Sequence, residues 1–124
     1  MTLEAIKFIN EKLSEVIPYE FNLWTDEITY PYWVGEVGET QINRELGEET
    51  TSVFVTGTTK GSFSDLEKQK SLIEKVIPRI DGAFKKVSDS HIIRVYFNGC
   101  SPTPTDNNNI KRLQITLEVK EWRL

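Results

Sequence analysis

A strand-like alternation near the end of the chain constrains the fold most. Every second position from 113 to 119 is apolar, and the positions between them are polar or charged: the apolar ones are Leu113, Ile115, Leu117 and Val119. Strand side chains point alternately to two faces, so the pattern predicts a strand with one buried and one solvated face. Such a strand is not stable alone. It requires neighbouring strands and a covering layer of helices or of a second sheet.

The size and composition of the chain fit one folded domain. Its 124 residues are enough to bury a single core, so we expect one α+β domain over residues 1–124. The hydrophobic share of 38% and the charged share of 27% are those of a globular protein. A formal net charge of -4 argues against a protein that holds duplex nucleic acid by neutralising its phosphates.

Cys100 is the only cysteine, so the sequence predicts no intramolecular disulfide, and a reducing compartment is the natural environment. The first residues have no basic region followed by an apolar run, and nowhere do about 18 apolar residues run together. We therefore expect neither a signal peptide nor a membrane-spanning helix, and no membrane partner.

Two helices are predicted from the spacing of apolar residues. Thr2 caps a first helix that Pro18 ends, with an apolar stripe of Leu3, Ile6, Ile9, Leu13, Val16 and Ile17. Ser64 and Glu67 have the spacing of a capping box and open a second helix. Its expected buried side holds Leu66, Leu72, Ile73, Val76, Ile77 and Ile80.

The remaining apolar segments predict strands over residues 19–24, 51–58, 83–87, 92–97 and 110–122. A further strand is predicted within residues 25–37, with Pro31 placing its start at a sheet edge or first position. Because most neighbours are joined by hairpins, we expect a largely antiparallel or mixed sheet of about five to six strands, with two helices packed on one face. Residues 38–50 are polar without a sustained period, which predicts a long exposed loop or arm. Residues 98–109 predict a second, turn-rich loop.

The segment between the third strand and the second helix holds Gly57, Lys60 and Gly61. A nucleotide-binding loop places its lysine directly after the second glycine, whereas here Lys60 precedes Gly61. Glycines that ease a strand-to-helix turn explain the segment better. The alternative is a small nucleotide- or anion-binding module that uses Lys60 and the helix start at 62–67.

No residue set has catalytic or metal-binding spacing. His91 and Cys100 are the only residues of their types, and a nucleophile pair would also need an orienting group and an oxyanion site. One His and one Cys do not supply the usual zinc ligands, and the carboxylates lack the spacing of a calcium loop. We expect no enzymatic activity, no metal and no cofactor.

The densest aromatic group combines Tyr30, Tyr32 and Trp33 with Trp24. Core packing is the default interpretation, but aromatics in a segment interrupted by proline also suit a protein contact. The acidic stretch from 36 to 49 is either a solvated surface or a charged face turned toward a partner or a channel. The candidate subunit-interface residues are therefore Tyr30, Tyr32, Trp33, Arg44, Glu45, Glu48 and Glu49.

Several segments together carry a resemblance to a known family: residues 32–36, residues 54–62 running into Leu66 and Glu67, residues 102–105 leading into 111–115, and Glu121 with Trp122. They resemble small structural proteins of tailed phages and prophages. Within this group the element order is similar to that of tail terminator, or tail completion, proteins. The resemblance implies an α+β subunit that closes into a ring, usually sixfold, where a long non-contractile tail joins the head.

The resemblance also implies the partners. These are further copies of the chain, in isolation or only on a template, together with tail-tube and head-connector proteins, while DNA passes without specific binding. The location implied is the host cytoplasm during assembly and then the tail or neck of the virion. Another minor capsid or head–tail connector protein remains an alternative.

Overall fold

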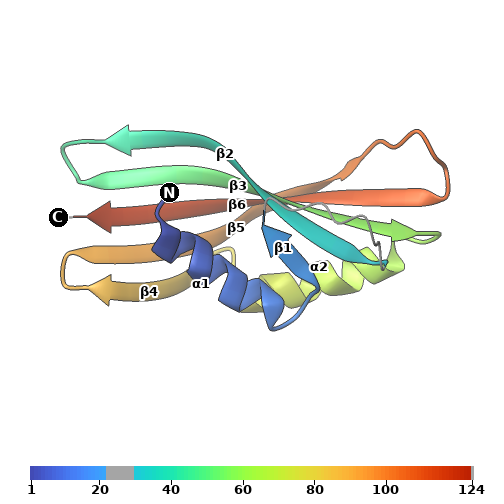
Figure 1. Cartoon of the computed structure of the whole chain (residues 1–124), viewed down its shortest axis with the longest axis horizontal. Coiled ribbons are helices and arrows are strands. Elements are labelled where there is room, and N and C mark those ends of the chain that lie inside the picture. Colours follow the sequence, from blue (N-terminus) through green and yellow to red (C-terminus); the bar gives the residue numbers. More distant parts are fainter. Residues whose placement is uncertain (22–29, 124) are drawn as a thin grey trace.

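The computed structural model describes residues 1–21 and 30–123. Within these residues there are two helices, α1 (Leu3–Ser14) and α2 (Ser64–Val76), and six strands: β1 (Tyr19–Phe21), β2 (Tyr32–Asn43), β3 (Glu48–Lys60), β4 (Ala83–Ser88), β5 (His91–Thr103) and β6 (Ile110–Arg123). The strands form one sheet in the order β1-β2-β3-β6-β5-β4 (Figure 1). Only β1 and β2 run parallel, and every other neighbouring pair is antiparallel. The predicted α+β class and largely antiparallel sheet are confirmed.

Both helices pack on one face of this sheet and enclose the core (Figure 1). The alternation of β6 is confirmed, since Ile115 and Leu117 are fully buried. Val53 and Val55 on β3 lie opposite these two residues and face the same side. The helices therefore cover the middle sections of three neighbouring strands, β3, β6 and β5.

The two helices begin differently. Thr2 caps α1 as predicted, its Oγ1 accepting from the N–H of Ala5 at 3.2 Å. The capping box predicted for α2 is not formed: the N-cap is Phe63, which makes no side-chain hydrogen bond. Ser64 is already inside the first turn, and its N–H donates to Oγ of Ser62 at 3.1 Å. The helix thus starts one residue earlier than the box requires.

The interpretation of residues 38–50 as a long loop or arm is wrong. β2 and β3 form a hairpin whose turn spans only residues 44–47, with Gly47 at φ 62. The end of β2 is exposed on both faces, so it shows no apolar alternation. Pairing of its backbone with β3 makes it a strand nonetheless. The loop between β5 and β6 is also shorter than the predicted 98–109, because β5 continues to Thr103.

The strand predicted over residues 19–24 is present as β1 up to Phe21. Residues 22–24 of that prediction, Trp24 among them, and residues 25–29 of the segment predicted to hold the second strand lie outside the described residues. β2 begins at Tyr32, directly after Pro31.

Candidate functional site

The aromatic residues predicted at an interface fall into two environments. The rings of Tyr30 and Tyr32 are half-buried and tilted, with centroids 5.7 Å apart. The Nζ of Lys60, at the end of β3, lies 5.3 Å from the Tyr30 ring centroid. Tyrosine faces combined with a lysine form a mixed apolar and cationic surface, of the kind found in protein contacts.

Trp33 is buried, and the expectation that it is exposed is wrong. Trp33 is 1% exposed, and its indole Nε1 donates to Oε1 of Gln69 on α2 at 2.6 Å. The ring packs on Gly57 of β3, where a Cβ atom would lie 2.7 Å from ring atoms. Trp33 therefore joins β2 to α2 inside the subunit and offers no surface to another chain.

Arg44 and Glu45 are exposed in the turn of the β2–β3 hairpin. The turn is held by the side chain of Asn43, whose Oδ1 accepts from the N–H of Leu46 at 3.4 Å. Beside it lies an open hollow of about 320 Å³, lined by Ile42, Asn43, Arg44, Gly47, Glu48, Glu49 and Arg123. The hairpin tip thus presents charged side chains where a neighbouring subunit could reach them.

Glu48 and Glu49 point to opposite faces of β3 and have partners within the subunit. Glu48 accepts from Nε1 of Trp122 at 3.1 Å and lies 3.5 Å from Nζ of Lys120. Glu49 is buried, where it pairs with the amino group of Met1 and accepts from Nη2 of Arg123 at 2.6 Å. Glu49 was predicted to be an exposed interface charge, and its burial excludes that role.

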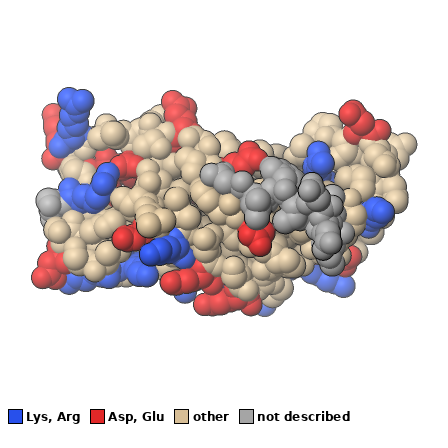
Figure 2. Space-filling model, in the orientation of Figure 1, with Lys and Arg blue, Asp and Glu red and all other residues tan. Residues whose placement is uncertain are grey.

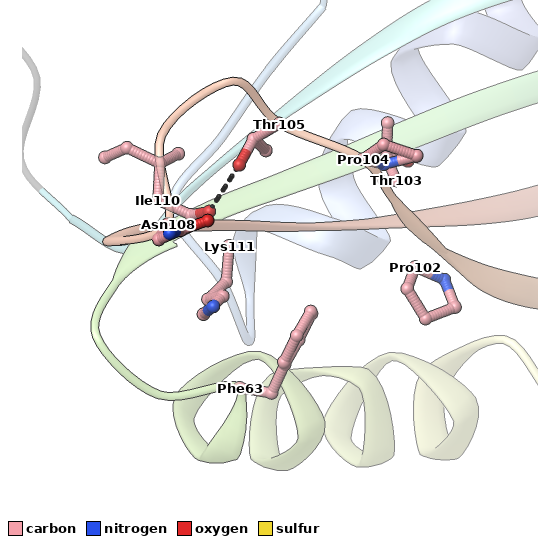
Figure 3. A pocket seen from close by; sticks show the side chains of 8 residues that line it. All are labelled: Phe63, Pro102, Thr103, Pro104, Thr105, Asn108, Ile110 and Lys111. Carbon is pink, nitrogen blue, oxygen red and sulfur yellow. Dashed lines mark hydrogen bonds between the residues drawn. The ribbon is translucent and has the colours of Figure 1, made fainter.

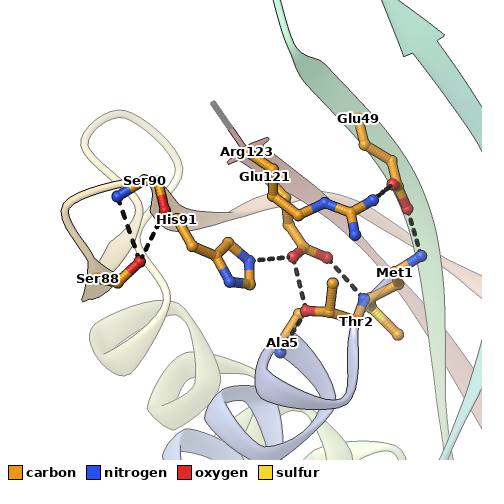
Figure 4. Close-up of polar contacts among 9 residues, drawn as sticks. All are labelled: Met1, Thr2, Ala5, Glu49, Ser88, Ser90, His91, Glu121 and Arg123. Atoms are coloured by element: carbon orange, nitrogen blue, oxygen red, sulfur yellow. Dashed lines mark hydrogen bonds and ion pairs between the residues drawn. The ribbon is translucent and has the colours of Figure 1, made fainter.

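A polar network that was not predicted from the sequence surrounds Glu121 of β6 (Figure 4). Glu121 is 1% exposed. One carboxylate oxygen accepts from the N–H of Thr2 at 2.9 Å, and the other accepts from Oγ1 of Thr2 at 2.7 Å. Nε2 of His91 lies 2.7 Å from the second oxygen. The network ties the start of α1 to β5 and β6.

The environment of Glu121 favours the ionised carboxylate. Burial disfavours the charge and raises the pKa of Glu121, but the hydrogen bonds from Thr2 and the contact with His91 outweigh it. The pKa of Glu121 is therefore below its ordinary value. A signal for this site was available, because position 121 continues the inward-facing series 113, 115, 117 and 119. The partners of Glu121 are Thr2 at the start of α1 and His91 of β5, so the network joins elements of the fold and we interpret it as structural.

A second open hollow, of about 310 Å³, lies between the start of α2 and the β5–β6 loop (Figure 3). Phe63 forms one wall, with Nζ of Lys111 6.0 Å from its ring centroid. The opposite side holds Pro102 and Pro104. Lys111 is the only charged residue among the lining residues, so the hollow has no set of groups that could perform acid–base or nucleophilic chemistry.

The single histidine and cysteine, weighed in the sequence as a formally possible pair, are far apart. His91 pairs with Arg123 and Cys100 with Ile115 along β6, which puts them about 27 Å apart at ~3.4 Å per residue. No group of three His, Cys, Asp or Glu side chains in residues 1–21 and 30–123 could hold a metal ion. At the start of α2, Asp65 and Glu67 already place negative charge in the first turn, which opposes a bound anion.

Charge is mixed over the face shown in Figure 2, where basic and acidic side chains are interspersed. No helix in the described part of the chain is long and apolar enough to cross a membrane.

Comparison with known proteins gives no family. No protein-family model matches this chain, and no curated protein sequence matches it.

Proposed function

We propose that this chain is a phage or prophage virion structural subunit, a tail terminator or tail completion protein that forms a ring at the head–tail junction. The observation that carries the proposal is that, among the described residues, the single sheet ends in two different open strand edges. Beyond Gly35, no described strand pairs with the outer side of β2, and β4 pairs only with β5. An open edge is a template for pairing with another chain.

Two different edges on one subunit favour a ring. A contact in which one edge of a subunit binds the other edge of the next is head-to-tail, and it closes into a ring when the rotation permits. The segments that resemble tail terminator proteins support the same role. They include the start of β2 and the second half of β3, which pair with each other at the end of the hairpin away from its turn.

The charge of the subunit fits a channel for DNA. A formal net charge of -4 and the interspersed charges of Figure 2 give no extended basic surface on that face to hold phosphates. DNA would therefore pass through such a ring without being bound tightly. We propose an assembly role without catalytic activity or cofactor, with further copies of the chain, the tail tube and the head connector as partners.

The test is the assembly state. Mass is measured by light scattering across protein concentration, and particles are examined by negative-stain microscopy, with and without phage tail tubes. Rings, or tubes capped at one end, are the expected result. Isolated subunits pay the full entropic cost of association, so a tube template is expected to promote the ring.

Other outcomes identify the alternatives. Binding to head connectors without any ring or capped tube would point to another minor capsid or connector protein. A strict monomer whose melting temperature rises with nucleotide or phosphate, and whose response is lost in Lys60→Ala, would establish an anion-binding module instead.

A further inference from the structure

We infer that the outer edge of β2 pairs with the outer edge of β4 of the next copy, so that the sheets of neighbouring subunits join side by side. The inference rests on the proposed ring and names the two surfaces that form it. On β2 the edge is residues 37–43, beyond the three positions that pair with β1. On β4 it is the side turned away from β5.

The two edges occupy the same rows of the sheet. Following the pairing from strand to strand, Thr40 of β2 lies in the row of Ala83 of β4, and Asn43 lies in the row of Lys86. Both edges are therefore at the same end of the sheet, where the β2–β3 and β4–β5 hairpins both turn, on opposite sides of β6 (Figure 1). The β4 edge of a second copy placed beside the first therefore meets the β2 edge without a shift of that copy along the strand direction.

This match has a consequence for closure. Four antiparallel steps separate β2 from β4, so the two strands run in the same direction and would form a parallel pair. A closed ring requires rotation without translation along its axis, whereas any translation gives an open helix. When the strands run along the ring axis, edges in the same rows meet this requirement.

The charges at the two edges are complementary. Glu39 precedes residues 40–43 of β2, and Arg44 and Glu45 follow them in the turn. All three are exposed, and their charges sum to a negative value. β4 carries Lys85 and Lys86. The ion pairs of these lysines within the subunit are weak: Nζ of Lys85 lies 4.0 Å from Glu11 and 5.8 Å from the Phe8 ring centroid, and Lys86 pairs with the fully exposed Asp89. Such surface pairs contribute little and exchange readily.

The same charges select one pairing among three. Two β4 edges would bring lysines together, and two β2 edges would bring glutamates together, so both symmetric pairings are repelled. Lysines on an edge strand commonly protect it from pairing with other chains. The lysines of β4 do not repel the acidic β2 edge, so the pairing of β4 with β2 is the only attractive one of the three.

Exposed apolar side chains lie beside both edges. On the β2 hairpin Ile42 is 69% exposed and Leu46 is 59% exposed. On β4 Phe84 is 51% exposed, and Ile80, just before the strand, is 88% exposed. Large apolar side chains left in water beside an open edge indicate a contact surface. Edge pairing would cover them together with the unpaired backbone.

A charge-exchange experiment tests the pairing. In one variant, Lys85→Glu and Lys86→Glu make both edges acidic; in the second, Glu39→Lys and Glu45→Lys make both edges basic. Each variant alone is expected to lose ring formation or tube capping. An equimolar mixture is expected to restore it, because the acidic β4 edge of one variant meets the basic β2 edge of the other. Copies alternate in the mixture, which suits a ring with an even number of subunits.

Two controls keep the result interpretable. A chain with all four substitutions has exchanged edges and should assemble alone, whatever the number of subunits. Lys68→Glu with Lys75→Glu, at exposed positions of α2, makes the same change in net charge as the Lys85 and Lys86 variant and should assemble normally. Circular dichroism and thermal unfolding establish that each variant is folded.

Cysteine trapping tests the register. In a Cys100→Ser background, Gln41→Cys and Phe84→Cys place thiols in the same row and on the same face of the sheet. Oxidation of the assembled protein is expected to give a ladder of disulfide-linked copies. Gln41→Cys paired with Leu72→Cys on α2 is the matched control and should give none.

The outcomes separate the inference from the proposed function. If the wild-type chain forms rings but the charge variants assemble alone and no ladder appears, the edge pairing is refuted and the ring stands. If the ladder forms but the particles are open filaments, the edges pair and the ring function is refuted. If neither the wild-type chain nor any variant assembles, even with tail tubes, both are overturned.

Discussion

The N-termini of the two helices are held by different interactions. At α1, Thr2 caps the first turn, and both its N–H and its hydroxyl donate to Glu121 of β6, which lies at the far end of the sequence. At α2 the N-cap is Phe63, without a side-chain hydrogen bond. One helix start is thus fixed by a distant buried carboxylate, and the other is fixed by the packing of its apolar face.

This difference shows where the polar interactions that hold the domain together lie. Removal of the Glu121 carboxylate would leave the polar groups of Thr2, at the start of α1, and of His91, on β5, without their partner, which lowers the free energy of unfolding. At α2 the corresponding side chains are exposed, and Leu66, Ile73 and Ile77 hold the helix through burial. Substitutions at the two starts should therefore differ strongly in their effect on stability.

The largest effect is expected for Glu121→Ala. The N–H and hydroxyl of Thr2 and the ring of His91 lose their partner in a buried site, so the free energy of unfolding should fall by about 3 kcal/mol. Urea denaturation measures this. Glu118→Ala, on the opposite face of β6, is the control, with an expected loss below about 0.5 kcal/mol. Similar losses in both variants would contradict the anchoring role.

The second prediction concerns pH. The pKa of Glu121 is lower in the folded protein than its ordinary value of 4.5. A group of this kind stabilises the fold above its unfolded-state pKa, and the contribution is lost as pH falls through the folded-state pKa. The stability difference between wild type and Glu121→Gln should therefore be constant near neutral pH and shrink below about pH 4.5. Denaturation midpoints across pH measure it, and a difference independent of pH would exclude an ionised Glu121.

A smaller loss is expected for Thr2→Ala. This change removes the helix cap and one of the two hydrogen bonds from Thr2 to Glu121, but leaves the backbone N–H bond in place. The expected loss is about 1–2 kcal/mol. Thr2→Ser keeps the hydroxyl and should recover most of it in the same denaturation measurement. Equal destabilisation by serine and alanine would show that the methyl group, rather than the hydroxyl, matters.

The smallest effect is expected at α2. Ser64→Ala should change the free energy of unfolding by less than about 0.5 kcal/mol, because Ser64 caps nothing in the structure. A formed capping box would instead cost about 1 kcal/mol on removal. The measured loss thus decides between the two descriptions of this helix start. It also sharpens the contrast with Thr2→Ala.

The parts of the fold that follow from local patterns could be predicted from the sequence. The alternation in β6 identified Ile115 and Leu117 as core residues, and Thr2 was recognised as a cap from its place before an amphipathic segment. Glu121 was missed because a charged side chain interrupts an apolar series, although it occupies an inward position. Its burial depends on Thr2 and His91, which no local pattern connects to it.

Features that depend on pairing between distant segments could not be predicted. Trp33 was assigned to an interface by its aromatic neighbours, but it is buried because it faces Gly57 across the β2–β3 pair and reaches Gln69 on α2. Residues 38–50 were assigned to a loop because both faces of the end of β2 are solvated. Of the predicted interface residues, Arg44 and Glu45 remain exposed at the hairpin tip.

The enclosed position of Trp33 gives the protein an optical reporter of its own. Indole fluorescence shifts to longer wavelength when water reaches the ring, and the Trp33 ring lies in the core with its Nε1 bonded to Gln69 of α2. Separation of α2 from the sheet would therefore shift the wavelength of its emission even while the strands remain paired. With Trp24 and Trp122 replaced by phenylalanine, the chain would report the docking of one helix without any attached dye.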